Sequence, residues 1–334
     1  MKVMVFDVPA SSGGALTILH QYYEKAIKDT TKEWIFVVST PELKEYPHIK
    51  VINFPWIKKS WFHRLYFDNF VAKKVVDKNK PDEILSLQNI LIPRTEKKQT
   101  LYLHQSLPFA EKRYKITENF KFWIYQNILS EKIFKSIENA DEIIVQTCWM
   151  RELVIDKTNV NSDKLVVETP EVNINVKKKY EKDNRNIFFY PAGAMDYKNH
   201  KVIIDACVKL KQDGIDNYEV VLTLNGDETN HIKTLYRITA LNNLPVKFIG
   251  SISVDEVYEY YSKSILLFPS YIETFGLPIL EVKFHDGIIL VSDCPFSREI
   301  LDNYKNVYYF NPFRIQDLAI LMDNLIKGYI NYFN

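Results

Sequence analysis

Two glutamates separated by seven residues are the most specific chemical signal in the sequence. Glu273 and Glu281 lie in the segment Phe268-Pro-Ser-Tyr-Ile-Glu-Thr-Phe-Gly-Leu-Pro-Ile-Leu-Glu281, which predicts a buried strand, a loop and a helix that opens near Gly276. Glu273 would precede that helix and Glu281 would lie about a turn and a half inside it, so both carboxylates could reach along one side of a ligand at the helix N-terminus. The alternative is a capping acid followed by a solvated helix acid.

Glycine is scarce, and its positions indicate a second candidate feature. Of only nine glycines, Gly13 and Gly14 follow the first predicted strand, Gly193 follows the first strand of the second half, and Gly276 opens the helix above. In doubly wound sheets, ligands bind at the carboxyl ends of the strands, where glycine lets backbone N–H groups approach a phosphate. Turns also need glycine for purely structural reasons, so this pattern alone leaves both interpretations open.

Several other kinds of site are excluded by motif. The chain has no G-x-G-x-x-G and no G-x-x-x-x-G-K-[ST], which argues against a nicotinamide-dependent dehydrogenase and a P-loop enzyme. It has no D-x-D pair, and its seven histidines show no close pairing at metal-ligand spacing, so we expect no required metal and no other cofactor.

The elements that would position these residues alternate between strands and helices. Short β-branched or aromatic runs at 2–6, 34–39, 50–54, 83–87, 100–104, 142–146 and 165–168 predict strands, with helices at 14–28, 62–77, 120–139 and 149–157. Further strands are expected at 187–191, 219–224, 246–249, 265–269, 288–292 and 307–310. This alternation predicts an α/β protein with parallel sheets.

The polar, aperiodic stretch 172–185 predicts a linker between two domains, 1–171 and 186–334. Each domain would be Rossmann-like and doubly wound. The last predicted helix, 315–332, would start on the second domain and could pack back on the first.

Composition excludes further classes of protein. Lys and Arg total 43 and Asp and Glu total 42, so no overall field attracts nucleic acid. No run reaches the ~18 apolar residues of a membrane-spanning helix. Three scattered cysteines and the absence of a secretory signal predict a cytoplasmic protein.

The E-x7-E segment, with its Phe-Gly-Leu-Pro, resembles the retaining glycosyltransferases of the GT-B fold, specifically the family 4 group. The resemblance extends in order through Asn186 to Ala206, Leu222 to Gly226, Val246 to Gly250 and Ser292 to Leu301, nearly the whole second domain. It implies two Rossmann-like domains facing across a cleft, the second binding a nucleotide-diphosphate sugar and the first presenting an acceptor.

The resemblance also implies a role for each matching residue. Glu281 would bind the ribose hydroxyls, and Glu273 would hold hydroxyls of the donor sugar. Lys198, after Gly193 in the phosphate turn, would bind the diphosphate, where cleavage of the sugar–phosphate bond builds negative charge. The N–H groups of Phe275, Gly276 and Leu277 would add to that stabilisation.

One departure from the family pattern concerns this phosphate turn. Many relatives carry an arginine shortly after its glycine, whereas this chain reads Ala192-Gly-Ala-Met-Asp-Tyr-Lys198. Either another cation, such as Lys201 or Arg298, substitutes, or stabilisation of the leaving group is weaker.

In the first domain, Ser11-Ser-Gly-Gly-Ala15 resembles the family's glycine-rich loop, which brings N–H groups to the diphosphate. His104 ends a predicted strand at the place where relatives put a histidine or aspartate near the reacting carbon. The alternative for His104 is a strand-end histidine that a backbone carbonyl satisfies, and the two interpretations have equal weight.

The segment 54–74 mixes Trp and Phe with Lys, His and Arg, and Phe62, Tyr66 and Phe70 recur at helical spacing. This pattern is typical of peripheral contact with an anionic membrane. The alternative, that the aromatics pack on the sheet and the cations snorkel at its edge, is somewhat favoured.

The resemblance therefore implies a retaining, metal-independent hexosyltransferase. It would move a sugar from a nucleotide-diphosphate donor, with UDP-sugar preferred, to a hydroxyl of a saccharide or lipid-linked saccharide in bacterial capsule, O-antigen or exopolysaccharide synthesis. The phosphate oxygen that departs would take the acceptor's proton, so no enzymic base is assigned. Association of the protein with the inner face of the cytoplasmic membrane would fit this setting. Two alternatives stay open: a nucleotide-sugar epimerase of the same fold, and an inactive partner subunit that binds nucleotide-sugar.

Overall fold

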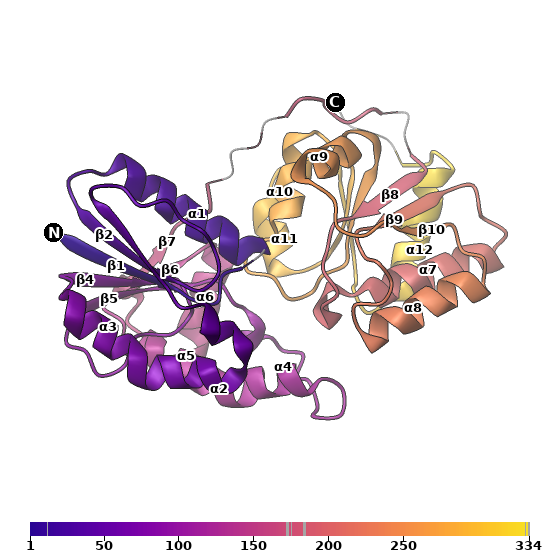
Figure 1. Cartoon of the computed structure of the whole chain (residues 1–334). Helices are drawn as coiled ribbons and strands as arrows, with labels where there is room; N and C mark the ends of the chain where they lie inside the picture. The colour runs from indigo at the N-terminus through magenta and orange to yellow at the C-terminus, as the bar shows by residue number, and fades with distance from the viewer. Residues whose placement is uncertain (12, 172–173, 175, 183–184, 331, 333–334) are drawn as a thin grey trace. The chain divides into compact units, whose positions relative to one another are not determined.

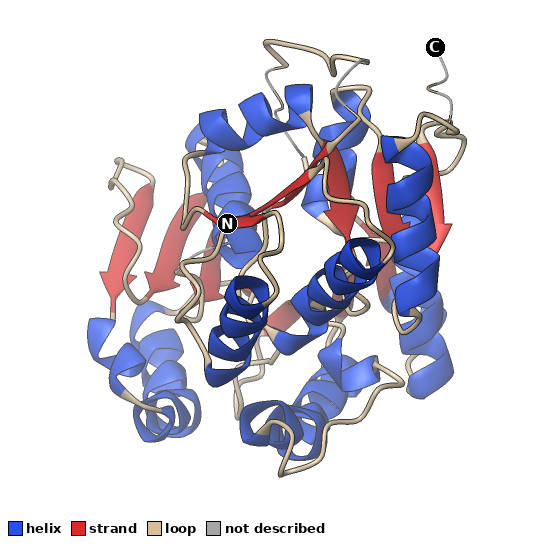
Figure 2. Cartoon of the chain, turned by 90° about the vertical axis from the view of Figure 1, so that its right-hand side faces the viewer, coloured by secondary structure: helices blue, strands red, loops and turns tan. Residues whose placement is uncertain are grey.

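Short apolar runs and intervening helices form two separate parallel sheets (Figure 1). The computed structural model describes residues 1–334 except 12, 172–173, 175, 183–184, 331 and 333–334. The chain divides into two units, 1–172 and 173–334. Helices flank the strands of each sheet (Figure 2), so each unit is the doubly wound α/β fold that the sequence predicts.

The first sheet has seven parallel strands in the order β3-β2-β1-β4-β5-β6-β7. The chain builds outward from β1 to β3 and then returns beside β1 with β4, which creates a topological switch point between β1 and β4. The strands are β1 (Lys2–Asp7), β2 (Glu33–Val38), β3 (Ile49–Asn53), β4 (Glu83–Ser86), β5 (Lys98–Leu103), β6 (Glu142–Val145) and β7 (Leu165–Val167).

Successive side chains of these strands point to opposite faces of the sheet and pack into two hydrophobic cores, one on each face. Val3 and Val5 of β1 face a core with α1, whereas Met4 and Phe6 face a core with the helices that follow β3. The helices are α1 (Gly13–Lys28), α2 (Trp61–Tyr66), α3 (Ala72–Asn79), α4 (Phe120–Ile124), α5 (Ser130–Asn139) and α6 (Cys148–Lys157), with short 3-10 helices η1 (Pro55–Lys59), η3 (Leu107–Phe109) and η5 (Ser162–Lys164).

Two of the predicted helices of this unit contain a π-helical turn. The helix expected at 62–77 is α2 and α3 joined through η2 (Phe67–Val71), and the helix expected at 120–139 is α4 and α5 joined through η4 (Tyr125–Leu129). Such turns recur at functional sites in proteins.

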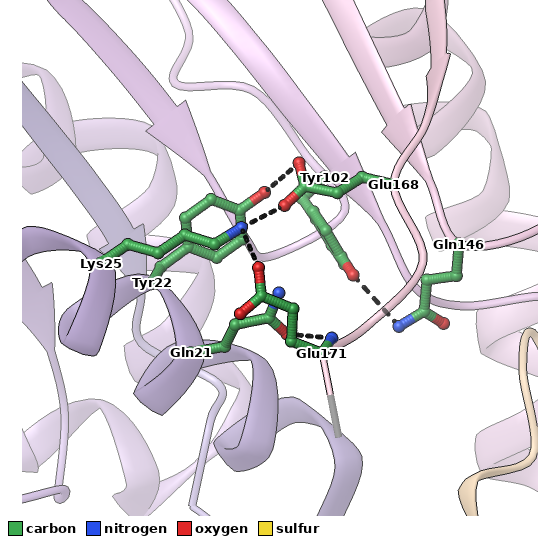
Figure 3. A network of polar contacts seen from close by, with 7 residues as sticks. All are labelled: Gln21, Tyr22, Lys25, Tyr102, Gln146, Glu168 and Glu171. Atoms are coloured by element: carbon green, nitrogen blue, oxygen red, sulfur yellow. Dashed lines mark hydrogen bonds and ion pairs between the residues drawn. The ribbon is translucent and has the colours of Figure 1, made fainter. Parts of the chain in front are cut away.

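A polar network ties α1 to the end of the first sheet (Figure 3). Glu168, which follows β7, accepts a hydrogen bond from the Tyr22 hydroxyl at 3.1 Å and pairs with Lys25 at 2.5 Å. Beside it, the Gln146 amide donates to the Tyr102 hydroxyl at 3.2 Å. The contacts of Glu168 fix α1, which starts at the glycine-rich loop, against the segment after β7.

The second sheet has six parallel strands in the order β10-β9-β8-β11-β12-β13, with its switch point between β8 and β11. Its strands are β8 (Ile187–Tyr190), β9 (Glu219–Leu222), β10 (Val246–Phe248), β11 (Ile265–Phe268), β12 (Ile289–Ser292) and β13 (Val307–Phe310). Its helices are the 3-10 helix η6 (Asp196–Lys198) and α7 (His200–Gln212), α8 (Asn230–Leu241), α9 (Val254–Lys263), α10 (Leu277–Phe284), α11 (Pro295–Ile300) and α12 (Ile315–Ile326).

The last helix is shorter than predicted. We expected it to reach residue 332, but α12 ends at Ile326. Gly328 adopts a left-handed conformation (φ 73°), and its N–H and that of Tyr329 bond back to Leu325 and Asn324. This Schellman motif ends the helix. The helix packs against α7 and β13, both in the second unit.

The predicted linker 172–185 lies partly outside the described residues. Its described part contacts the second unit: the backbone N–H groups of Tyr180 and Glu181 donate to the carbonyls of His285 and Ser262, each at 2.8 Å. The Tyr180 side chain is buried. This part of the segment is therefore packed structure.

Candidate functional site

The carboxyl ends of β8 and β11 bring two of the predicted site residues together. Lys198 follows β8 and Glu273 follows β11, and Lys198 Nζ lies 2.5 Å from Glu273 Oε1. Only 16% and 14% of the two side chains are exposed. A charge-assisted hydrogen bond in such partial burial holds both side chains in one orientation.

Local structure fixes the position of Lys198. The short helix η6 ends at this residue, and the buried Tyr190 hydroxyl donates to its carbonyl at 2.9 Å. Asn199 then adopts a left-handed conformation (φ 58°), and its side-chain amide donates to the Pro312 carbonyl at 2.8 Å. The ammonium also lies 5.8 Å from the ring of Phe268. Gly193 lies exposed in the turn after β8.

The start of α10 presents backbone N–H groups. Gly276 is the N-cap residue with φ 85°, a conformation that favours glycine. Pro278 has no N–H, and the N–H of Ile279 bonds to the Gly276 carbonyl at 3.0 Å. Leu277 is therefore the first-turn residue whose N–H points out of the helix start, and the other two predicted donors, Phe275 and Gly276, immediately precede it.

Glu281 lies inside α10, and a tyrosine orients its carboxylate. The buried Tyr261 hydroxyl of α9 donates to Glu281 Oε2 at 2.8 Å, leaving Oε1 available to a ligand. Burial raises the pKa of Glu281, while the Tyr261 hydrogen bond lowers it. Sequence reasoning missed Tyr261, because the α9 pattern carries no sign that this residue reaches the E-x7-E helix.

In the first unit, the glycine-rich loop has a cation of its own. Gly13 (φ 60°) and Gly14 begin α1 and are exposed, while Ser12 lies outside the described residues. Lys58 of η1 donates from Nζ to the Pro9 carbonyl at 2.6 Å and to Ser11 Oγ at 3.1 Å. This lysine was noticed in the sequence only as part of a membrane-like segment.

His104 follows β5 at the carboxyl end of the first sheet. Its backbone N–H donates to Asn89 Oδ1 at 2.8 Å, and its ring lies edge-on to Tyr102, with the centroids 5.8 Å apart. Burial lowers the pKa of His104 to about 4, so the imidazole is neutral near pH 7. A neutral ring can bind a hydroxyl as donor or acceptor.

The cations considered as substitutes for the missing arginine are engaged elsewhere. Lys201 forms an ion pair with Asp205 one turn along α7. Arg298 pairs with Asp293 through two nitrogens, at 2.7 and 2.9 Å, and lies over the Tyr309 ring. His200 adds no charge, because burial lowers its pKa to about 3. Lys198 is thus the cation next to Glu273.

The aromatic segment 54–74 divides between core and surface. Phe54, Trp56 and Phe67 pack in the core under α2 and α3, as the packing alternative predicts. Phe62, Tyr66 and Phe70 are instead 82%, 54% and 54% exposed.

Among the described residues, no helix has the length and apolar character to cross a membrane. Nor do three potential metal ligands of the His, Cys, Asp or Glu type gather anywhere in the described part of the chain.

Solved structures share this two-unit architecture. HepE (Alr3699) of Anabaena in complex with UDP and glucose superposes with a TM-score of 0.70 at 15% identity, covering 98% of this chain and 90% of that one. Sucrose-phosphate synthase of Thermosynechococcus elongatus gives a TM-score of 0.74 at 15% identity, with the same coverage. The chain has the GT-B fold.

Residues 172–332, which contain Lys198, Glu273 and Glu281, match the family described as Glycosyl transferases group 1. The second unit of this protein is therefore similar to that family. A curated relative is the O-antigen chain mannosyltransferase RfbU of Salmonella typhimurium, 25% identical over 234 residues. That match covers 67% of this chain and 63% of the relative.

Proposed function

We propose that the protein is a retaining glycosyltransferase that moves a sugar from a nucleotide-diphosphate donor to a hydroxyl of a saccharide or lipid-linked saccharide. The observation that carries the proposal is the Lys198–Glu273 pair at the switch point of the second sheet. Ligands of open α/β sheets bind at such points. The family match of residues 172–332 supports the reaction class, and the O-antigen relative supports a role in surface polysaccharide assembly.

In this mechanism the bond between sugar C1 and the diphosphate oxygen breaks, and negative charge grows on the diphosphate. The Lys198 ammonium and the N–H groups of 275–277 stabilise that charge. Glu273 holds sugar hydroxyls and orients Lys198, and Glu281 accepts from the ribose hydroxyls. The diphosphate oxygen that departs takes the acceptor's proton on the same face, so the configuration at C1 is retained without a separate base.

The first unit supplies the remaining groups of the proposal. The N–H groups at Gly13 and Gly14 approach the diphosphate, and His104 binds near the reacting carbon and the acceptor. The exposed aromatics Phe62, Tyr66 and Phe70 support peripheral contact with a membrane that carries a lipid-linked acceptor.

We place a UDP-sugar first among donors, because HepE is a structural neighbour in complex with UDP-glucose. A mannosyl donor comes second, because the curated relative is a mannosyltransferase. Fixed cations and dipoles replace a metal in this scheme, so turnover should not need one.

The test is a screen of UDP-, GDP- and dTDP-sugars with EDTA present, following nucleoside diphosphate release with and without lipid-linked acceptors. Acceptor-dependent release in EDTA is expected, and the anomeric configuration of the product tests retention. Binding without release would favour the inactive partner subunit, an alternative that the engagement of Lys201 and Arg298 supports. Isomerisation of the donor without acceptor would indicate an epimerase.

A further inference from the structure

A second group of polar side chains lies at the switch point of the first sheet, where β1 and β4 end. β1 ends at Asp7 and Gln88 follows β4 by two residues. Lys58 and Arg64 come from η1 and α2, which follow β3. The group therefore occupies, in the first sheet, the position that Lys198 and Glu273 occupy in the second.

Lys58 and Arg64 each have a hydrogen-bond donor that their contacts within the described chain do not use. Lys58 uses two of its three ammonium donors on Pro9 and Ser11. Arg64 donates from Nε to both Asp68 oxygens, at 2.8 and 2.9 Å, and from Nη2 to Gln88 Oε1 at 3.0 Å. Within the described chain these contacts leave Nη1 of Arg64 for a ligand.

Gln88 adds a donor that is buried and unused. Only 4% of the residue is exposed, and among the described residues its Nε2 atom has no hydrogen-bond partner. Because Oε1 of the same amide accepts from Arg64, Nε2 lies beside the guanidinium. A buried amide without a partner costs free energy, so a polar ligand at this point would relieve the cost.

The charges favour an anion. Lys58 and Arg64 bring two positive charges, and Asp68 neutralises one of them. Asp7 is fully buried, and this burial raises its pKa to about 8. It is therefore largely protonated at pH 7, and the group keeps a net positive charge.

We propose that Lys58, Arg64 and Gln88 form a binding site for a phosphoryl group at the switch point of the first sheet. A planar guanidinium, an ammonium and an amide next to a glycine-rich loop suit a tetrahedral oxyanion with several acceptors. The site itself stands on contacts within the first unit. Its assignment to a substrate rests on the proposed function, under which the phosphoryl group belongs to the donor diphosphate or to the diphosphate of a lipid-linked acceptor.

Inorganic pyrophosphate is the probe for the test, titrated calorimetrically into the full chain at low ionic strength. The Lys198→Met background removes the second-unit cation assigned to the diphosphate, and the difference between first-unit variants in that background reports the first unit. In that background, Lys58→Met should weaken pyrophosphate binding about tenfold or more. Lys59→Met is the matched control, because Lys59 is the exposed neighbour, and it should change binding less than twofold.

Equal binding by the Lys58→Met and Lys59→Met chains would overturn the site, and so would an Lys198→Met chain that does not bind pyrophosphate. Lys58 is exposed on a short helix, so its variant should fold, which circular dichroism checks. Because this readout needs no turnover, a failure of the proposed transferase activity would remain distinguishable from a failure of the site.

Competition then identifies the source of the phosphoryl group. Displacement of pyrophosphate at lower concentrations of UDP than of farnesyl diphosphate supports a site for the donor. The reverse order supports a site for a lipid-linked acceptor. Displacement by neither would mean that the bound pyrophosphate reflects nonspecific attraction of anions, and would overturn the proposal.

Discussion

Lys198 Nζ lies 2.5 Å from Glu273 Oε1, so the cation assigned to the diphosphate and the carboxylate assigned to the sugar hold each other in place. The pair joins residues that are 75 positions apart, and it forms because β8 and β11 are neighbours whose parallel strands end at one edge. Under the proposed function, each residue therefore acts on the donor partly through the other.

Substitution of either member should reduce turnover strongly. Lys198→Met removes leaving-group stabilisation, and we expect kcat to fall by about 100-fold or more. Glu273→Gln should cost a similar factor, and the double variant should lose less than the product of the two effects, because the residues act as a unit. Lys201→Met, three residues further along in α7 and paired with Asp205, should retain kcat. A Lys198→Met enzyme as fast as Lys201→Met would refute the assignment.

Tyr261 should set the affinity for the donor nucleotide and its dependence on pH. The Tyr261 hydrogen bond lowers the pKa of Glu281, so Tyr261→Phe raises that pKa further above its usual range. The ionised carboxylate then protonates at a higher pH as the solution is acidified. We expect the donor KM of the variant to rise several-fold and to start rising at higher pH than in the parent enzyme, with kcat little changed. Tyr258→Phe is the control, and identical KM–pH profiles for all three proteins would contradict the proposed role.

His104 should act as an uncharged group throughout the pH range in which the enzyme is assayed. Its pKa of about 4 means that its charge does not change between pH 6 and 8. His104→Ala should lower acceptor-dependent transfer by about 10- to 100-fold while leaving the affinity for UDP unchanged. The pH dependence of the remaining activity should keep its shape over this interval. A variant with parental transfer rates would support the structural alternative for this histidine.

Asp7 should make the free energy of unfolding fall as the pH rises. Its folded-state pKa is about 8 and its reference value is 3.8, so between these values the native state binds more protons than the unfolded state. Stability is then highest below pH 4, declines up to about pH 8 and levels off above it, as far as this group is concerned. Asp7→Asn should remove that decline and stabilise the protein at pH 8 by a few kcal/mol. Urea unfolding at pH 5, 6.5 and 8 measures the free energy of unfolding of the variant and of the parent protein. The advantage of the variant should grow with pH.

The exposed aromatics of α2 and η2 should carry the binding to membranes. Phe62→Ser with Phe70→Ser removes two rings that are 82% and 54% exposed, and we expect this variant to lose most of its cosedimentation with vesicles of phosphatidylglycerol. Phe313→Ser with Tyr329→Ser, which removes exposed rings of the second unit, is the matched control. Equal loss in both double variants would point to general hydrophobicity rather than to this surface.

Much of the fold was predictable because strands and helices here follow local apolar periodicity. The predicted strand at 83–87 is β4 at Glu83–Ser86, a difference of one residue. Lys198 and Glu273 were each expected after a strand of the second domain, and the family resemblance assigned both to the donor, but their direct contact was not predicted. The end of α12 was missed because Gly328, which stops the helix, lies inside an otherwise periodic stretch.

Contacts set by distant elements were not predictable. The bond between Tyr261 and Glu281 depends on how α9 packs beside α10, and the contact between Arg64 and Gln88 depends on how α2 crosses the end of β4. Neither pair has a spacing in the chain that local periodicity detects. The sequence marked Arg64 only as one of several basic residues among aromatics.

The two π-helical turns have a consequence for tracing descent. A π turn contains one residue more than an α-helical turn, so a relative whose helix is regular here should align with a one-residue gap within 67–71 or 125–129. Loss of that residue alone would rotate everything after it by about 100° and turn Ala72 and Val76 away from the core. A relative can therefore lack this residue only if the core around the following helix was repacked. Shared presence of the π turn is thus a marker of common ancestry that does not depend on overall sequence identity.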